Sequence, residues 1–226
     1  MSDIAFLVLE SPWEEPTKGS RRLTARPFFE GLEKIHPTVA VYYATFYDTA
    51  SLRSALDDLL QAREARQVIY IDSHGSRGRV GDIRQDVFRR LLLDRKDSLK
   101  RVEGLIISAC DVFYSKEYEL LSLLTQTGFR WAMGYSCTIG WFDSTLIELA
   151  ILNALAEQPD TTYRRSQGQL ADFFRKALSL FNHAHPLDWP GSGTVAEHLV
   201  TDVTHHLLPF AGKGICVNCK SLFPVN

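Results

Sequence analysis

The chain has 226 residues, of which 45% are hydrophobic and 23% are charged, and its formal net charge is −2. A chain of this length and composition can bury a sizeable hydrophobic core, and its nearly balanced charge argues against a general attraction to nucleic acid or anionic lipid. Four cysteines are too few for a disulfide framework at this length, which favours catalytic, metal-binding or core roles for them.

The start of the chain, residues 1 to 4, lacks the basic flank and long apolar run of a signal peptide. No stretch approaches eighteen uninterrupted apolar residues, the length that a membrane-spanning helix needs. We therefore expect a cytoplasmic protein without a membrane partner.

Strand and helix patterns alternate along the first two thirds of the chain. Apolar or β-branched runs predict strands, and apolar residues three and four positions apart predict helices. In chain order we expect a strand at 4–9, a polar loop at 10–22, a helix at 24–35, a strand at 39–46, a helix at 52–60, a strand at 68–72, a glycine-punctuated turn at 76–81, a helix at 83–93, a strand at 105–107, a helix over 118–124 closed by Gly128, a strand at 131–135, and a helix opening at Thr145 with a capping box to Glu148.

This alternation predicts an α/β fold with an open, mostly parallel sheet covered on both faces. The alternation stops near residue 158. A helical pattern continues to Phe181, and a proline- and glycine-rich loop follows at 183–193. We therefore divide the chain into a core of residues 1–157 and a helical C-terminal extension of residues 158–226 with an irregular tail.

Two of the expected strands end in residues that carry chemistry. The strand at 68–72 leads into Ser73-His74-Gly75, and the strand at 105–107 leads into Ser108-Ala109-Cys110. If the two strands are parallel neighbours, their carboxyl ends meet at one edge of the sheet. A thiol and an imidazole would then face each other across a cleft.

A cysteine nucleophile acts as its thiolate, which a nearby histidine or a helix N-terminus stabilises. Cys110 has His74 as the expected partner and a predicted helix shortly after it. The backbone N–H groups of Gly75 and Cys110 are candidates for an oxyanion hole. In the alternative interpretation, Cys110 is a small buried hydrophobic residue and His74 is a hydrogen-bonded residue at the end of a strand.

The order of a strand, His74-Gly75, a helix, another strand and Ser108-Ala109-Cys110 resembles the caspase-like cysteine peptidases, a group that includes caspases, separase, gingipains and the bacterial CHAT proteases. Residues 107–110 are most similar to the CHAT pattern, and the resemblance covers about residues 1–157. It implies a caspase-like three-layer sandwich. It also implies that Cys110 forms an acyl-enzyme, that His74 polarises the scissile carbonyl or protonates the leaving amine, and that no cofactor takes part.

The same resemblance implies a substrate pocket lined by Trp141 and Asp143. A carboxylate at Asp143 would pair well with a substrate Arg or Lys, although a helix-entry cap is an equal alternative. Asp72 shares a strand face with His74, because alternate side chains of a strand share a face. It is a candidate to assist His74 or to bind a basic substrate residue, with a solvated carboxylate at a strand end as the alternative.

The remaining cysteines offer weaker signals. Cys137 also follows a strand and is a competing nucleophile, but its sequence context offers no partner histidine. Cys216-Val217-Asn218-Cys219, with His205 and His206 upstream, has the spacing of half a zinc site. A tail with two incidental thiols is the alternative that we favour, and we expect no metal.

These observations predict a cysteine endopeptidase that cuts a protein partner after a defined residue, more often basic than acidic. By the resemblance, a second protein would activate it, and a role in bacterial antiviral defence or regulated cell death is a hypothesis. Two alternatives remain: a catalytically inactive caspase-like scaffold, and a doubly wound protein that binds a small molecule or nucleotide. The first strand leads into ESPWEEP instead of a glycine-rich phosphate cradle, which argues against the nucleotide binder.

Overall fold

The computed structural model describes residues 2–12, 23–76, 78–112, 126–135, 138–158 and 167–181. Several sequence-based predictions lie outside these ranges. They concern Cys137, the helix expected over 118–124, the loop at 183–193, and the tail with its CxxC and histidine pair.

The centre of the fold is a five-stranded sheet in which every neighbouring pair is parallel. Its strands lie in the order β2-β1-β3-β7-β8. They are β1 (Ile4–Glu10), β2 (Val39–Thr45), β3 (Arg66–Asp72), β7 (Val102–Ser108) and β8 (Trp131–Met133). All seven residues of each of the strands β1, β3 and β7 are buried, which explains the apolar runs at 4–9, 68–71 and 105–107 within them.

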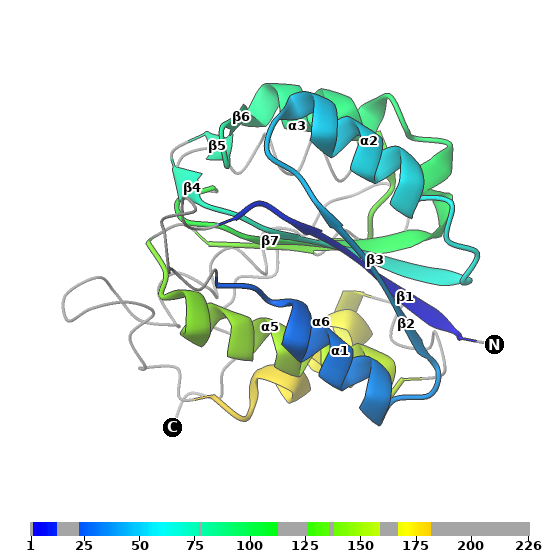
Figure 1. The fold of residues 1–226 in the computed structure, drawn as a ribbon. Coiled ribbons are helices and arrows are strands. Elements are labelled where there is room, and N and C mark those ends of the chain that lie inside the picture. Colours follow the sequence, from blue (N-terminus) through cyan, green and yellow to red (C-terminus); the bar gives the residue numbers. More distant parts are fainter. Residues whose placement is uncertain are drawn as a thin grey trace.

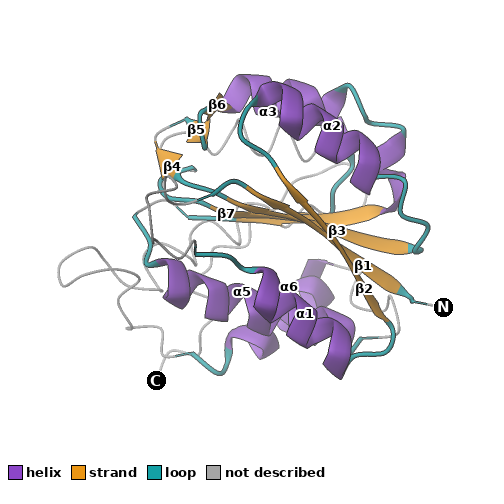
Figure 2. Ribbon diagram, viewed as in Figure 1, coloured by secondary structure: helices purple, strands orange, loops and turns teal. Residues whose placement is uncertain are grey.

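Helices cover both faces of this sheet, as Figures 1 and 2 show. The helices are α1 (Arg26–Ile35), α2 (Thr49–Leu59), α3 (Gln85–Leu93), α5 (Trp141–Ala156) and α6 (Gln167–Leu178), and a short 3-10 helix, η1, spans Ser98–Arg101. In the view of Figure 1, α2 and α3 lie above the sheet, and α1, α5 and α6 lie below it. The expected α/β fold with a mostly parallel sheet covered on both faces is confirmed. Within the described residues, no helix combines the length and apolar character needed to cross a bilayer.

Each face of the sheet contributes to its own hydrophobic core. Along β3, Val68 and Tyr70 belong to the cluster that contains residues of α1, α5 and α6, whereas Ile69 and Ile71 belong to the cluster that contains residues of α2 and α3. This division follows from the alternation of side chains along a strand. It places Asp72, two residues beyond Tyr70, on the face covered by α5.

The predicted turn at 76–81 is part of a small antiparallel sheet. Its three strands are β4 (Gly75–Ser76), β5 (Arg79–Val80) and β6 (Ile83–Arg84). Gly78 and Gly81 have positive φ angles of 74° and 58°, a conformation that glycine adopts without steric cost. Because β4 follows β3 after only two residues, this small sheet fixes the path of the chain at His74.

The start of α5 differs from the sequence-based expectation. The capping box from Thr145 to Glu148 is wrong, because α5 begins at Trp141 with Gly140 as its N-cap. The Thr145 hydroxyl donates instead to the Trp141 carbonyl at 2.6 Å, one turn earlier in the helix. A threonine followed three residues later by a glutamate also occurs inside helices, where the hydroxyl bonds to a preceding carbonyl.

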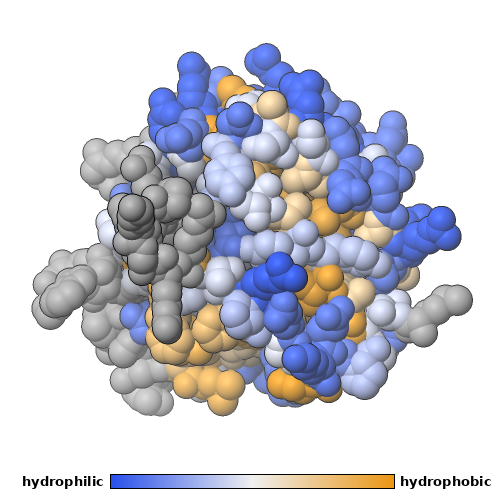
Figure 3. All heavy atoms as spheres, viewed as in Figure 1, coloured by the Kyte–Doolittle hydropathy of each residue, from blue (hydrophilic) through white to orange (hydrophobic). Residues whose placement is uncertain are grey.

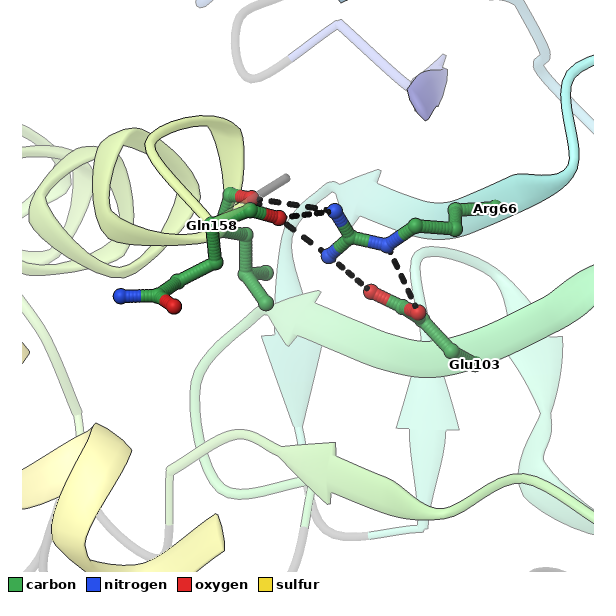
Figure 4. A network of polar contacts seen from close by, with 4 residues as sticks. Arg66, Glu103 and Gln158 are labelled. Carbon is green, nitrogen blue, oxygen red and sulfur yellow. Dashed lines mark hydrogen bonds and ion pairs between the residues drawn. The ribbon is translucent and has the colours of Figure 1, made fainter. Parts of the chain in front are cut away.

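A buried ion pair lies at the amino end of the strand pair β3 and β7, as Figure 4 shows. Arg66 Nη2 lies 3.0 Å from Glu103 Oε1, and Arg66 Nε donates to Oε2 at 3.3 Å. The same guanidinium donates to the carbonyl of Gln158 at 2.7 Å and to that of Leu155 at 3.4 Å. Arg66 therefore connects both strands to the C-terminal end of α5.

The segment beyond residue 158 contributes to the same core. Leu170, Phe173 and Phe174 of α6 are buried in the cluster that includes α5 and β8. The rings of Phe174 and Trp131 meet edge to face with centroids 5.4 Å apart. This described part of the expected C-terminal extension packs on the sheet.

Candidate active site

The two strands that carry the candidate dyad are neighbours. β3 and β7 pair in parallel with Asp72 opposite Ser108, and the Ser73 N–H donates to the Ser108 carbonyl at 3.1 Å. The strands therefore end at the same level of the sheet. This pairing confirms the expected strand arrangement and brings the segments around His74 and Cys110 to one edge, on the left of Figure 1.

Gly75 lies directly against the backbone of Cys110. A Cβ atom at position 75 would be 2.1 Å from the Cys110 carbonyl oxygen and 2.4 Å from its nitrogen, so no larger residue fits without movement of the backbone. The Gly81 N–H donates to the His74 carbonyl at 2.6 Å. Hydrogen-bonded and non-hydrogen-bonded residue pairs alternate in an antiparallel ladder. Since His74 and Gly81 are hydrogen-bonded, the next pair, Gly75 and Val80, is a non-hydrogen-bonded pair, and the Gly75 N–H points away from β5. The two residues expected to form an oxyanion hole are therefore adjacent.

The thiol of Cys110 is partly exposed, and His74 is exposed. The backbone N–H of Ile139 donates to Cys110 Sγ at 3.4 Å, and the Ile139 carbonyl lies 3.9 Å from the same sulfur. Asp111, the next residue after Cys110, has a φ of 53°, a left-handed conformation that aspartate tolerates better than most residues. The chain therefore turns sharply immediately after the sulfur.

The helix N-terminus described beside the sulfur is that of α5, because Ile139 directly precedes its N-cap Gly140. The sequence predicted a different helix for this role, one that begins shortly after Cys110. Residues 113–125 lie outside the described ranges, so that prediction stays untested.

The three predicted substrate-binding residues differ in accessibility. Asp72 has no exposed surface, and its Oδ2 accepts a hydrogen bond of 3.2 Å from the Trp141 indole nitrogen. Trp141 is half-buried and packs against the ring of Phe28, with ring centroids 6.0 Å apart. Asp143 is half-buried in the first turn of α5 and is not its N-cap. Of the two carboxylates, Asp143 is the one that solvent reaches.

A buried carboxyl group below this edge was not identified from the sequence. Glu148 has no exposed surface, and its two oxygens accept hydrogen bonds from the hydroxyls of Tyr70 at 2.6 Å and Tyr135 at 2.9 Å. Burial is the largest cause that raises the pKa of Glu148 to about 8; the nearby Asp72 carboxylate also raises it, and the hydrogen bonds to Glu148 oppose the shift. The signal in the sequence is one acidic residue in the middle of an otherwise apolar helical run.

The surface around the site is more hydrophobic on the side of α1, α5 and α6. Phe142 and Leu146 of α5 are 54% and 40% exposed, although both are large and apolar. In Figure 3, hydrophobic residues gather over the lower part of this face, next to the atoms drawn in grey. This surface begins at the same end of α5 as Trp141.

A hollow of about 380 Å³ lies elsewhere, among residues that include Leu60, Arg63, Lys100 and Arg101. Arg63 and Arg101 precede β3 and β7, so this hollow belongs to the amino edge of the sheet, opposite the candidate dyad. Among the described residues, no cluster of His, Cys, Asp or Glu side chains is suited to hold a metal ion.

Comparisons with protein-family models, with curated proteins and with solved structures found no match.

Proposed function

We propose that the protein is a cysteine endopeptidase with a caspase-like fold, in which Cys110 is the nucleophile and His74 is its partner. The observation that carries this proposal is the contact between Gly75 and the backbone of Cys110 at the ends of two paired parallel strands. This contact joins the His-Gly and Ser-Ala-Cys segments, which lie more than thirty residues apart in the sequence. The partial exposure of the thiol favours a reactive role over that of a core residue.

The proposed reaction proceeds through an acyl-enzyme. Cys110 Sγ attacks the carbonyl carbon of the scissile bond, and the N–H groups of Gly75 and Cys110 stabilise the oxygen that becomes negative. His74 accepts the proton of the Cys110 thiol and gives it to the leaving amine as the carbon–nitrogen bond breaks. Water then attacks the thioester, which releases the acid product and regenerates the thiol.

Substrate selection is proposed to involve the first turn of α5. Asp143 is the carboxylate that we assign to a substrate Arg or Lys, because it is partly exposed, and Trp141 forms a wall of the same pocket. Asp72 is fully buried and accepts a hydrogen bond from the Trp141 indole. This difference makes Asp72 a support for Trp141 and Asp143 the contact residue.

The biological part of the proposal follows from the family resemblance. We propose a cytoplasmic enzyme that cuts one protein target, that a second protein switches on, and that serves bacterial antiviral defence or regulated cell death. The exposed Phe142 and Leu146 beside the site are suited to contact a protein. No cofactor is needed for the reaction as written.

The test is cleavage of a peptide library by the wild-type chain, Cys110→Ala and His74→Ala, supplied with a lysate fraction as the source of an activating partner. We expect cleavage by the wild type alone, after Arg or Lys. Ser76→Ala is the matched control, because Ser76 is exposed and follows the same His-Gly segment, and it should cleave like the wild type.

A peptide electrophile provides a second measurement, with the labelled residue located by mass spectrometry. Labelling of Cys110 is the expected result. Equal cleavage by the wild type and Cys110→Ala would remove Cys110 from the mechanism. Absence of both labelling and cleavage in the activated complex would favour the catalytically inactive scaffold.

A further inference from the structure

Two side-chain hydrogen bonds connect α5 to the carboxyl-terminal half of β3. Trp141, in the first turn, donates to Asp72 at the end of β3. Seven residues later Glu148 accepts from Tyr70, which lies two residues earlier in β3. Positions seven apart share a helix face, and positions two apart share a strand face. One face of α5 therefore meets one face of β3 twice.

Glu148 also connects α5 to the segment after β8. The Tyr135 hydroxyl donates to Glu148 Oε1 at 2.9 Å and lies 3.4 Å from the Ser144 carbonyl of the same helix. Tyr135 and Tyr70 are fully buried, and the ring of Phe29 from α1 packs against Tyr70 with centroids 4.7 Å apart. Glu148 is therefore buried with a hydrogen-bond partner on each side.

The position of α5 along the sheet determines what its N-terminal end contacts. Ile139, just before the N-cap, donates to Cys110 Sγ, and Trp141 meets Asp72. At the other end of the helix, Arg66 bonds to the Leu155 carbonyl. Because α5 is one uninterrupted helix between these ends, a contact at Glu148, near its middle, also affects how far its N-terminus reaches toward the sulfur.

We propose that Glu148 is a positioning residue for the candidate dyad: by bridging Tyr70 and Tyr135 it holds α5 where Ile139 meets Cys110 and Trp141 meets Asp72. This inference deepens the proposed peptidase and rests on it only for its kinetic readout. Glu148 acts through α5 and touches no reacting atom.

The bridge depends on the protonation of Glu148. Tyr70 and Asp72 face it from β3, Ser108 from β7 and Tyr135 from the segment after β8, while α6 adds apolar side chains to the same cluster. Asp72 is the acidic neighbour in this set. When Glu148 loses its proton near pH 8, two carboxylates share a buried space, and their repulsion pushes α5 away from β3.

The test follows the indole N–H resonance of Trp141 by NMR between pH 6 and pH 9.5, with the signal assigned through Trp141→Phe. The wild-type resonance should shift with a midpoint near pH 8, and Glu148→Gln, which is neutral and similar in shape, should lack this transition. Glu157→Gln is the matched control, because it makes the same change at an exposed position after the same helix, and it should titrate like the wild type.

Peptide cleavage gives the second readout. The kcat/KM of the wild type should fall at least tenfold between pH 7 and pH 9, and Glu148→Gln should retain its pH 7 value over that range. Glu148→Ala should lose activity at every pH, because it removes the bridge, and the Gln variant should rescue it. If Glu148 only stabilised the fold, the kcat/KM values of the wild type and of Glu148→Gln would depend on pH in the same way.

Two outcomes would overturn the inference: a Trp141 resonance that does not titrate near pH 8, or a transition that persists in Glu148→Gln. If Glu148→Gln fails to fold, Tyr135→Phe replaces it. That variant removes a hydrogen bond that lowers the pKa of Glu148, so the midpoint should move to higher pH, and an unchanged midpoint would refute the bridge. A protein without peptidase activity leaves the NMR result intact, so failure of the proposed function is distinguishable.

Discussion

The two ends of the strand pair β3 and β7 differ in how far their polar groups are exposed. At the amino end, Arg66 and Glu103 form a two-pronged ion pair, with side chains 6% and 1% exposed, and two backbone carbonyls also accept hydrogen bonds from Arg66 (Figure 4). At the carboxyl end, the strands present a partly exposed thiol and an exposed imidazole.

The comparison shows how one pair of strands combines stability with reactivity. Buried charges that are fully paired resist change, because breaking one contact leaves the other group uncompensated. Reactive groups need access to substrate and to water. The helix α5 links the two ends, since Arg66 binds its C-terminal carbonyl and Cys110 meets the residue before its N-cap.

The largest expected effect comes from breaking the amino end. Arg66→Met removes the guanidinium that pairs with the buried Glu103 carboxylate, and we expect the free energy of unfolding to fall by about 3 to 5 kcal/mol. Urea unfolding measures this loss. The double variant Arg66→Met with Glu103→Leu removes both charges and should recover most of it. A double variant that is no more stable than the single one would contradict this account.

The next effect concerns pH and the buried Glu148. Its pKa is about 8 in the folded state and near 4.5 when unfolded, so between pH 5 and pH 7 the folded state holds one more proton. The contribution of Glu148 to the free energy of unfolding therefore falls by about 1.4 kcal/mol per pH unit as the pH rises. From pH 5 to pH 7, the free energy of unfolding of Glu148→Gln should therefore rise by about 3 kcal/mol relative to that of the wild type.

Urea unfolding of both proteins at several pH values measures this change. The control Glu157→Gln, altered at an exposed position, should differ from the wild type by the same free energy of unfolding at every pH. A constant difference for Glu148→Gln as well would mean that Glu148 is ionised in the folded protein.

The smallest expected effect comes from two glycines in different surroundings. Gly75→Ala places a Cβ against the Cys110 backbone, and overpacking of this kind costs about 1 to 3 kcal/mol. The rate of peptide cleavage should fall by more than this loss of stability can explain, because the displaced segment carries His74. Gly31→Ala, in α1 with nothing within 4 Å, should stabilise the protein by up to about 1 kcal/mol and leave cleavage unchanged. Normal cleavage by Gly75→Ala would argue against the assembled site.

Several features could be predicted from the sequence because they depend on local patterns. The apolar runs of β1, β3 and β7 predict buried parallel strands, and they are buried along their whole length. The pairing of β3 with β7 could be expected, because two parallel strands that are joined through a helix are usually neighbours in the sheet. The start of α5 was missed, because Gly140 caps it without a side-chain hydrogen bond and Thr145 imitates a capping signal.

The alternation of strands and helices, the burial of the central strands, and the placement of His74 and Cys110 after two of them can be predicted from the amino-acid sequence, because they arise from the spacing of neighbouring residues. Other features depend on the folded chain: the contact of Gly75 with Cys110, the hydrogen bond from Ile139 to the sulfur, and the hydrogen bonds of Glu148 with Tyr70 and Tyr135 close to the Asp72 carboxylate. These contacts join residues far apart in the chain, and the register of strands and the depth of a helix are set by the packing of the whole core.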